Sequence, residues 1–554
     1  FKQKTAYEIM PSLVGSEMCI RDRLDVVTLI LMFLVTLLIP FIAMNLIAVY
    51  PRTIARYTRI HSIGDIPEIL SYLVMYLKLV PNLENSIKFT AKESSTTLTR
   101  ALRKMIWDME IRVYHGVNDA ITHFANKWGK HSDHLKRALH LIRSSIDEPE
   151  EAQRIITLNK ALDVGLDGTR DLMNEFASKL HQPTLIIYSI GVMIPLSLIA
   201  MLPATALIGM NITIFQIFIL YDIILPVILY LYMRSILLSR PATFNPPIIS
   251  KEHPYLKNMN KHRSQIIAVI LGLAITIPYI LFGIPGIPMV FFPIWGLTIA
   301  ITYYTISVYR PYKKIRDDIR SMEEEFTDAL YILGKRISEE KSPEESFIYT
   351  AETMRGSKIA EIFNRIGYNL TALHTNLHDA LFHPEYGSLK YVYSSRIRAI
   401  MHLFIEGIKK SHKSASISII KLADHLKELQ EVEKRIRETL GSLTATLRST
   451  AAFFAPLIAG VTLAITKVVT LLINRLNNNS IVAKSSMFNV FSIENIQPEY
   501  FILVISIYII ELVILLTRFT NGIDEGDDKA EYMYNLGRTL PISIATLTVT
   551  VILS

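Results

Sequence analysis

The chain has 554 residues, of which 50% are hydrophobic and 19% are charged, and its formal net charge is +8. Soluble domains carry roughly 25% charged residues. Here the apolar residues gather in runs long enough to cross a bilayer, which takes about 20 residues at 1.5 Å each. The composition therefore argues against a soluble globular protein and predicts an all-α, polytopic membrane protein.

Residues 1–23 have no pattern continuous with the rest of the chain. The stretch KQKTAYEIMPSLVGSEMCIRDR resembles translated sequencing-adapter read-through, so we expect a non-native leader here and leave it out of the fold prediction. The only cysteine, Cys19, lies in this stretch. We therefore expect no disulfide, thiol nucleophile or cysteine metal site in the rest of the chain.

Eight apolar runs predict about eight transmembrane helices. They group as one span at 26–50, two at 184–233, two at 265–309 and three at 449–554. Between them, two charged stretches at 51–183 and 310–448 predict helical-bundle domains, and 234–264 is a Pro-rich basic linker. The runs are Val26–Tyr50, Thr184–Gly209, Ile212–Met233, Gln265–Phe282, Pro288–Tyr309, Ser449–Leu472, Tyr500–Leu516 and Leu540–Leu553.

The positive charge is distributed as a topology signal. Lys and Arg gather on the cytoplasmic side of membrane proteins, and here they cluster on one side if the eight spans alternate. We therefore expect both domains and the linker in the cytoplasm of a cell-membrane protein, and no nucleic-acid partner. The acidic stretch from Asp524 to Glu531 departs from this rule, and it is either a second partner surface or a sign of miscounted spans.

The chain repeats at an offset of 260 residues. Eight identities without a gap fall between Pro51 and Ala91, and conservative pairs such as Asp65/Glu325 add to them. This pattern predicts two duplicated cytoplasmic domains, each with an entry and an exit span. The identities are Pro51/Pro311, Arg56/Arg316, Leu70/Leu330, Leu73/Leu333, Glu84/Glu344, Ser86/Ser346, Thr90/Thr350 and Ala91/Ala351.

Apolar residues at three- and four-residue spacing predict helices in both domains. Ser342-Pro343 fits a helix start, with Ser342 as the cap. The last helix of the second domain carries an apolar seam, which indicates packing within the bundle or, alternatively, a coiled coil between subunits. The seam consists of Leu422, Leu426, Leu429, Val432, Ile436 and Leu440.

Two prolines occupy matched places in the exit spans. Pro195 and Pro456 lie 261 residues apart. A proline inside a helix removes one hydrogen bond and kinks the helix. Both residues are therefore either membrane hinges or elements of static packing.

Catalytic and metal-binding motifs are missing from the sequence. It contains no phosphate loop of the form GxxxxGK[S/T] and no HExxH, and we interpret His374/His378 as surface histidines, so we expect no enzyme activity, cofactor or metal. Within the predicted spans, Asp222 and Glu511 occupy comparable places. We interpret them as structural groups that pair with Lys467 or with tyrosines, rather than as an ion path.

Three runs of this sequence resemble the type II secretion system F domain family. DIPEILSYLVMYLKLVPNLENSIKFTAKE and EEFTDALYILGKRISEEKSPEESFIYTAET are similar to its helix-turn-helix signature. KALDVGLDGTRDLMNEFASKLHQPTLIIYSIGVMIPL resembles the exit into the membrane. The resemblance covers Val26 to the C-terminus, and the tandem arrangement is most similar to archaeal members of the family.

The resemblance implies a membrane platform for an archaellum or related archaeal pilus, which assembles as a type IV pilus-like machine. Its implied partners are a cytoplasmic hexameric secretion ATPase, pilin- or archaellin-like subunits, the lipid bilayer and a second copy of the chain in a homodimer. The polar positions kept in both copies are the candidates for ATPase contact or coupling: Arg56/Arg316, Glu68/Asp328 and Glu84/Glu344. Alternatively, Arg56 and Arg316 only anchor the membrane boundary.

Two rival interpretations are a secondary transporter with duplicated halves and a membrane-anchored signalling receptor. The large charged domains and the scarcity of ionisable residues in the spans argue against the transporter. The absence of kinase motifs and of a sizeable outward domain argues against the receptor.

Overall fold

The computed structural model describes residues 26–94, 96–207, 214–241, 260–282, 288–410, 412–478 and 498–553, together with positions 249, 253 and 256. The secondary structure of these residues is entirely helical, which confirms the all-α prediction. The predicted leader at 1–23 and most of the predicted linker at 234–264 lie outside the described residues.

The chain divides into two units, residues 1–59 and residues 60–554. Helix α2 (Val26–Gly64) supplies the described part of the first unit and ends just inside the second. It contains Pro40 and Pro51, and the candidate residue Arg56 is exposed on it.

The first helical domain belongs to the second unit. Its core gathers the apolar stripe predicted from the sequence, including Leu70 and Leu73, with apolar residues of the five helices after it. These helices are α3 (Ile66–Leu79), α4 (Leu83–Glu93), α5 (Thr97–Glu110), α6 (Val117–Gly129), α7 (Asp133–Ser144) and the beginning of α8 (Glu151–Tyr188).

The second helical domain has its own core around Phe326, Leu330 and Phe347. Ser342 caps α15 by accepting a hydrogen bond from the Glu345 backbone N–H, as the sequence predicted. The domain comprises the end of α14 (Phe291–Ser338), α15 (Pro343–Thr353), α16 (Lys358–Thr371), α17 (Leu377–Phe382), α18 (Ser395–Lys410) and the beginning of α19 (His412–Ser449).

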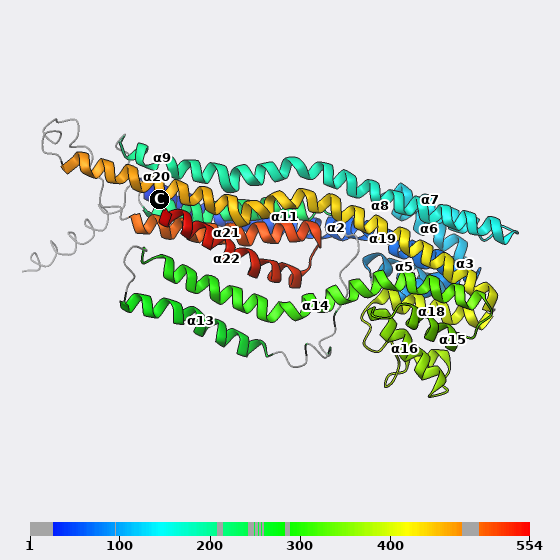
Figure 1. The fold of residues 1–554 in the computed structure, drawn as a ribbon. Helices are drawn as coiled ribbons and strands as arrows, with labels where there is room; N and C mark the ends of the chain where they lie inside the picture. Colours follow the sequence, from blue (N-terminus) through cyan, green and yellow to red (C-terminus); the bar gives the residue numbers. More distant parts are fainter. Residues whose placement is uncertain are drawn as a thin grey trace, which may run out of the picture. The chain divides into compact units, whose positions relative to one another are not determined.

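Three long helical paths leave these domains for a shared core of membrane-type helices (Figure 1). The first path joins α8 to α9 (Ile194–Leu207) through a π-helical turn, η2 (Ser189–Met193). The second joins α19 to α20 (Ala455–Asn478) through η4 (Thr450–Phe454), and the third is α14 itself. A helix of 51 residues, such as Glu151–Met201, is about 75 Å long, which is more than twice the thickness of a bilayer core.

The remaining membrane-type helices are α10 (Ile214–Phe218), η3 (Ile219–Ile224), α11 (Leu225–Leu237), α13 (Lys261–Phe282), α21 (Pro498–Asp524) and α22 (Lys529–Leu553). Six described helical segments are long and apolar enough to cross a membrane. Helices α2 and α13, which contain the runs Val26–Tyr50 and Gln265–Phe282, are not among the six, so spanning by these two stays a prediction.

The predicted apolar seam of α19 packs inside the molecule. Leu422 and Leu426 belong to the core of the second domain, Leu429 belongs to the core of the first, and Ile436 and Leu440 belong to the membrane-helix core. One face of a single helix therefore contributes to three cores in succession, and this confirms the intramolecular alternative.

Candidate functional site

Each of the three π-helical turns precedes a proline by two positions. They are η2 before Pro195, η3 before Pro226 and η4 before Pro456. At each turn the residue before the proline donates its N–H five residues back, as Ile194 does to Ser189. Proline has no N–H of its own, and the longer turn relieves the contact of its ring with the preceding turn. The sequence predicted two of these three sites, and Pro226 was missed.

The break at Pro195 is closed by tyrosines from neighbouring helices. The Gly191 carbonyl would ordinarily accept from the N–H of residue 195, four positions later, which proline lacks. Instead, the Tyr508 hydroxyl of α21 donates to the Gly191 oxygen, and the Tyr221 hydroxyl of η3 donates to the Pro195 oxygen at 2.8 Å. The bend in the first path is thus held from two other segments.

A charged cleft of about 600 Å³ opens where the two helical domains meet the middle of α14. It is lined by α3, α14, α18 and α19 and by Glu525, which follows α21. Two of the residues predicted from the sequence, Glu68 and Arg316, lie on its wall. Both acidic and basic side chains line the cleft, so its wall does not present a surface of a single charge.

Glu68 is held inside the cleft rather than presented to solvent. Its Oε1 accepts a hydrogen bond from the Ser94 hydroxyl at 2.9 Å. Burial raises the pKa of Glu68, and the Ser94 hydrogen bond and the positive charge of Arg396 only partly oppose this effect.

Arg396 of α18 is the central cation of the cleft and was missed in the sequence. Its Nη1 lies 3.6 Å from Glu323 of α14 and 3.8 Å from Glu433 of α19. Burial disfavours the charged guanidinium, but the two carboxylates outweigh this and raise the pKa of Arg396. It therefore links three helices by charge, and no repeat or motif in the sequence marked it.

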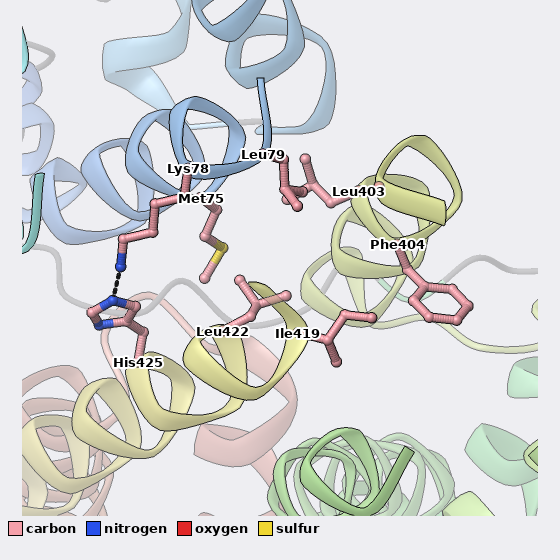
Figure 2. Close-up of a pocket in the computed structure, with 9 residues that line it drawn as sticks. Met75, Lys78, Leu79, Leu403, Phe404, Ile419, Leu422 and His425 are labelled. Carbon is pink, nitrogen blue, oxygen red and sulfur yellow. Dashed lines mark hydrogen bonds between the residues drawn. The ribbon is translucent and has the colours of Figure 1, made fainter. Parts of the chain in front are cut away.

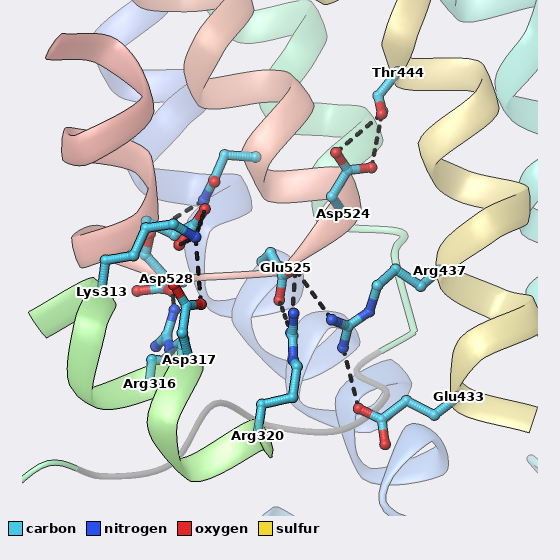
Figure 3. A network of polar contacts seen from close by, with 12 residues as sticks. Lys313, Arg316, Asp317, Arg320, Glu433, Arg437, Thr444, Asp524, Glu525 and Asp528 are labelled. Atoms are coloured by element: carbon cyan, nitrogen blue, oxygen red, sulfur yellow. Dashed lines mark hydrogen bonds and ion pairs between the residues drawn. The ribbon is translucent and has the colours of Figure 1, made fainter. Parts of the chain in front are cut away.

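A junction network shares part of the cleft wall and joins α14 and α19 to the end of α21, the beginning of α22 and the segment between them (Figure 3). The α14 side supplies Arg316, which pairs with Asp528, and Lys313, whose Nζ lies 2.9 Å from Glu531 Oε1. The network as a whole comprises Lys313, Arg316, Arg320, Glu433, Arg437, Thr444, Arg448, Asp524, Glu525, Asp528 and Glu531.

Glu525 ties the two long helices together within this network. It lies 3.3 Å from Arg320 of α14 and 3.7 Å from Arg437 of α19. Burial opposes ionisation of Glu525, but Arg437 and Arg320 outweigh it and lower the pKa of the carboxyl. Asp524 accepts from the Thr444 hydroxyl at 2.8 Å and pairs with Arg448.

Four acids of the stretch from Asp524 to Glu531 are paired with cations of the same chain, so these four carboxylates do not form a free acidic surface. The other expectation from the sequence, a miscounted number of spans, stays a prediction. Sequence reasoning missed the pairing because the pairs join residues more than 70 positions apart, and a charge pattern along the chain cannot specify such pairs.

A second polar contact joins the two domains directly (Figure 2). Lys78 of α3 hydrogen-bonds through Nζ to Nε2 of His425 on α19, among apolar neighbours that include Met75 and Leu422. Burial, followed by the nearby charge of Lys421, lowers the pKa of Lys78 to about 7. Met75 also packs in the core of the second domain, so α3 serves both domains.

Three other predicted positions of the second unit do not line the cleft. Glu84 and Glu344 are each the second residue of a helix, where a carboxylate favours the helix dipole, and Glu84 also pairs with Lys88 at 2.7 Å. Asp328 is exposed on α14. Arg56 belongs to the first unit. The structure therefore brings together Glu68 and Arg316 and leaves Glu84, Asp328 and Glu344 separate from them.

The polar groups of the junction network are paired with one another, as are Arg396 and Glu323 of the cleft, and this arrangement is suited to holding helices in register. His378, which the sequence grouped with His374, contacts Asp379 at 3.2 Å, and no group of three metal-ligating side chains forms within the described ranges. Comparison of the chain with protein-family models, with curated proteins and with solved structures finds no match.

Proposed function

We propose that this protein is the membrane platform of an archaeal type IV pilus-like machine, such as an archaellum or an adhesion pilus. In this proposal a cytoplasmic hexameric secretion ATPase moves the two helical domains. The long helices carry that movement into the membrane, where pilin-like subunits are inserted into the filament. The platform contributes no nucleotide hydrolysis of its own, in keeping with the lack of a phosphate loop in its sequence.

The observation that carries the proposal is the continuity of helix from domain to membrane segment. Glu151–Met201 and Ile419–Val469 each run for 51 residues, from a charged domain into the shared membrane-helix core. A continuous helix is a stiff connection, and displacement at one end therefore reaches the other. In each of these two paths, the π-helical turn and the proline after it provide a defined place for bending.

Several structural correspondences support the duplication within this proposal. Helix α4 begins and ends 260 residues before α15, and η2 lies 261 residues before η4. The matched acids Asp65 and Glu325 also make equivalent hydrogen bonds. Asp65 accepts a hydrogen bond from the Thr97 N–H at 2.9 Å, and Glu325 accepts one from the Ile359 N–H at 3.1 Å. In each copy the acid satisfies a free donor at the start of the third helix.

Among the six candidate residues, Asp328 and Glu344 are the best placed for a partner. Glu68 and Arg316 are engaged in the cleft, whereas Asp328 is exposed and Glu344 is only partly covered. Both belong to the second helical domain. A basic surface on the ATPase is the complementary partner for these two carboxylates.

The test is reconstitution of the full-length protein in lipid vesicles with a hexameric secretion ATPase from the same genome. We expect the protein to bind the ATPase and to stimulate ATP hydrolysis, and we expect Asp328→Lys and Glu344→Lys to reduce the stimulation several-fold. Glu361→Lys, which reverses another exposed acid of the second domain, is the matched control and should leave the stimulation unchanged.

Two results would count against the platform. Wild-type protein that neither binds nor stimulates the ATPase would refute the coupling. An equal loss in all three variants would mean that general charge, rather than Asp328 and Glu344, governs binding.

One observation favours the second candidate function, a secondary transporter with duplicated halves. Asp222 and Glu511 lie within candidate membrane spans, where ionisable residues usually mark a transport path. Solute uptake by vesicles that contain the protein alone, driven by an ion gradient, would support the transporter. Uptake that is absent for all solutes tested, together with ATPase stimulation, would support the platform.

A further inference from the structure

Two acidic side chains lie near the middle of two candidate membrane spans. Asp222 belongs to the span Ile214–Leu237, and Glu511 belongs to the span Tyr500–Asp524. Only 8% of the Asp222 surface is exposed. Both carboxylate oxygens of Asp222 and one of Glu511 are buried without a hydrogen-bond partner among the described residues. Neither acid pairs with Lys467 there, contrary to one of the expectations from the sequence.

The tyrosine hydroxyls beside the two acids already donate hydrogen bonds to backbone carbonyls. The rings of Tyr221 and Tyr508 meet edge to face at 5.8 Å, so the segments that carry the acids pack against each other. Their hydroxyls donate to Pro195 and Gly191, respectively, and not to the carboxylates. Asp222 directly follows Tyr221 and Glu511 lies three residues after Tyr508, so both acids are carried beside this tyrosine contact.

An ionised carboxylate in this position lacks the groups that ordinarily stabilise it. Burying an unpaired charge is costly, and the cost is greater within the apolar core of a membrane. Two neighbouring carboxylates also oppose each other's ionisation, and a pair of this kind commonly shares one proton. A protonated carboxyl, by contrast, carries no charge and can donate a hydrogen bond to its neighbour.

We propose that Asp222 and Glu511 form an intramembrane proton-binding site in which at least one of the two carboxyls is protonated at neutral pH. Two independent observations support this: each acid lies within one helical turn of a tyrosine of the packed Tyr221/Tyr508 pair, and Asp222 is more than nine-tenths buried with both oxygens unpartnered. The site takes a proton, and a monovalent metal cation of the same charge is the competing ligand.

The position of the site connects it to the bend in the first helical path. Asp222 directly follows Tyr221, and Glu511 lies one helical turn after Tyr508, so the two acids are carried by the segments that close the break at Pro195. Loss of the proton would leave two negative charges that must admit water or a cation, or move η3 away from α21. Proton occupancy and the geometry of the bend are therefore linked.

The experiment uses dicyclohexylcarbodiimide, an apolar reagent that reacts with protonated carboxyls in membranes. The carboxyl oxygen adds to the central carbon and the acidic proton passes to nitrogen, and the adduct rearranges to a stable N-acylurea without loss of atoms. Full-length protein in vesicles is labelled across a series of buffers from acidic to alkaline, and the labelled residue is identified by peptide mass spectrometry.

We expect labelling of Asp222 or Glu511 that falls as the pH rises, and no labelling of the exposed Asp328. Asp222→Asn and Glu511→Gln should each abolish or sharply reduce it. Infrared spectroscopy supplies a second readout, because a protonated carboxyl has a carbonyl stretch that shifts on deuteration, and this band should disappear in either variant.

Three outcomes would overturn the site. These are absence of both label and infrared band in the wild type, retention of the band in both variants, and protection from labelling by sodium but not by choline at one pH. The last result would identify a metal cation as the ligand. None of these readouts depends on the ATPase, so the site and the platform function can fail separately.

Discussion

Lys78 is a buried residue at the contact between the two domains, and its titration should make the free energy of unfolding depend on pH. The residue is 8% exposed, and burial lowers its pKa to about 7 from an ordinary value of 10.5. The folded state therefore binds fewer protons than the unfolded state between these values, so this group makes stability rise with pH across that window. A pKa difference of one between the folded and unfolded states corresponds to about 1.4 kcal/mol.

We therefore predict that Lys78→Met is stabilising relative to wild type at pH 7 and that this advantage shrinks as the pH approaches 10.5. Unfolding in detergent, followed by tryptophan fluorescence over a pH series, measures it. Lys88→Met is the control, because Lys88 forms an exposed pair with Glu84 and should show no such trend. A difference between Lys78→Met and wild type that does not vary with pH would contradict the assignment.

The pair Arg316–Asp528 is the most buried ion pair of the junction network, with side chains 11% and 3% exposed. Removing one partner leaves a buried charge uncompensated, which costs about 3–5 kcal/mol. We predict losses of this size for Arg316→Met and for Asp528→Asn, and a smaller loss for Arg316→Met/Asp528→Leu than for either single change. Thermal unfolding measures all three.

Lys409→Ala removes an exposed pair with Glu406 and should have no measurable effect on unfolding. Strictly additive losses in the Arg316/Asp528 double variant would mean that the two residues do not depend on each other. The repeat in the sequence selected Arg316 but gave no indication of Asp528, because nothing in a single sequence specifies a partner 212 positions away.

At the scale of elements, the helix at Pro195 depends on two features: the missing N–H of the proline itself, and a hydroxyl that a distant helix supplies. The proline was identifiable in the sequence because its chemistry is local. The hydroxyl that completes the bend was not, because Tyr508 comes from a helix more than 300 residues later. The same division applies to helix starts: the Ser342 cap was predicted, whereas the acceptor role of Asp65 toward α5 was not.

This combination predicts a dependence between Pro195 and Tyr508. Tyr508→Phe removes the hydroxyl that donates to the Gly191 carbonyl and should cost about 1–3 kcal/mol. Pro195→Ala supplies an N–H four residues after Gly191, so the same tyrosine change should cost less in that background. The four proteins form a double-mutant cycle that thermal unfolding can measure.

Tyr500→Phe is the control for this cycle, because Tyr500 is half exposed at the beginning of α21. A loss for Tyr508→Phe that is equal with and without Pro195 would show that the hydroxyl does not replace the missing backbone donor.

For the whole molecule, apolar runs predicted the helical class and the six helical segments that are long and apolar enough to cross a membrane. They did not predict that α19 contributes to three cores. The spacing of Leu422, Leu429 and Ile436 is the same whether these residues pack into one hydrophobic core or into several. The number of spans depends on α2 and α13.

Helix α13 packs against α14 through two glycines. A Cβ at Gly272 would lie 2.8 Å from the Gly296 oxygen, and a Cβ at Gly296 would lie 2.8 Å from the Gly272 oxygen, so the two backbones touch. Close approach through small residues is typical of helix pairs within a membrane. Because α14 contains a candidate span, this contact indicates that α13 crosses beside it.

We therefore predict that residues at the two ends of α13 lie on opposite sides of the membrane. Asn260→Cys and Met289→Cys, each in a Cys19→Ser background, place single thiols at exposed positions that flank the helix. A membrane-impermeant maleimide should label one in sealed vesicles and the other only after the vesicles are opened. Asp328→Cys should follow Asn260→Cys, because α14 would return the chain to the first side. Labelling of Asn260→Cys and Met289→Cys from the same side would remove α13 from the spans and leave the chain with one crossing fewer than the duplicated arrangement requires.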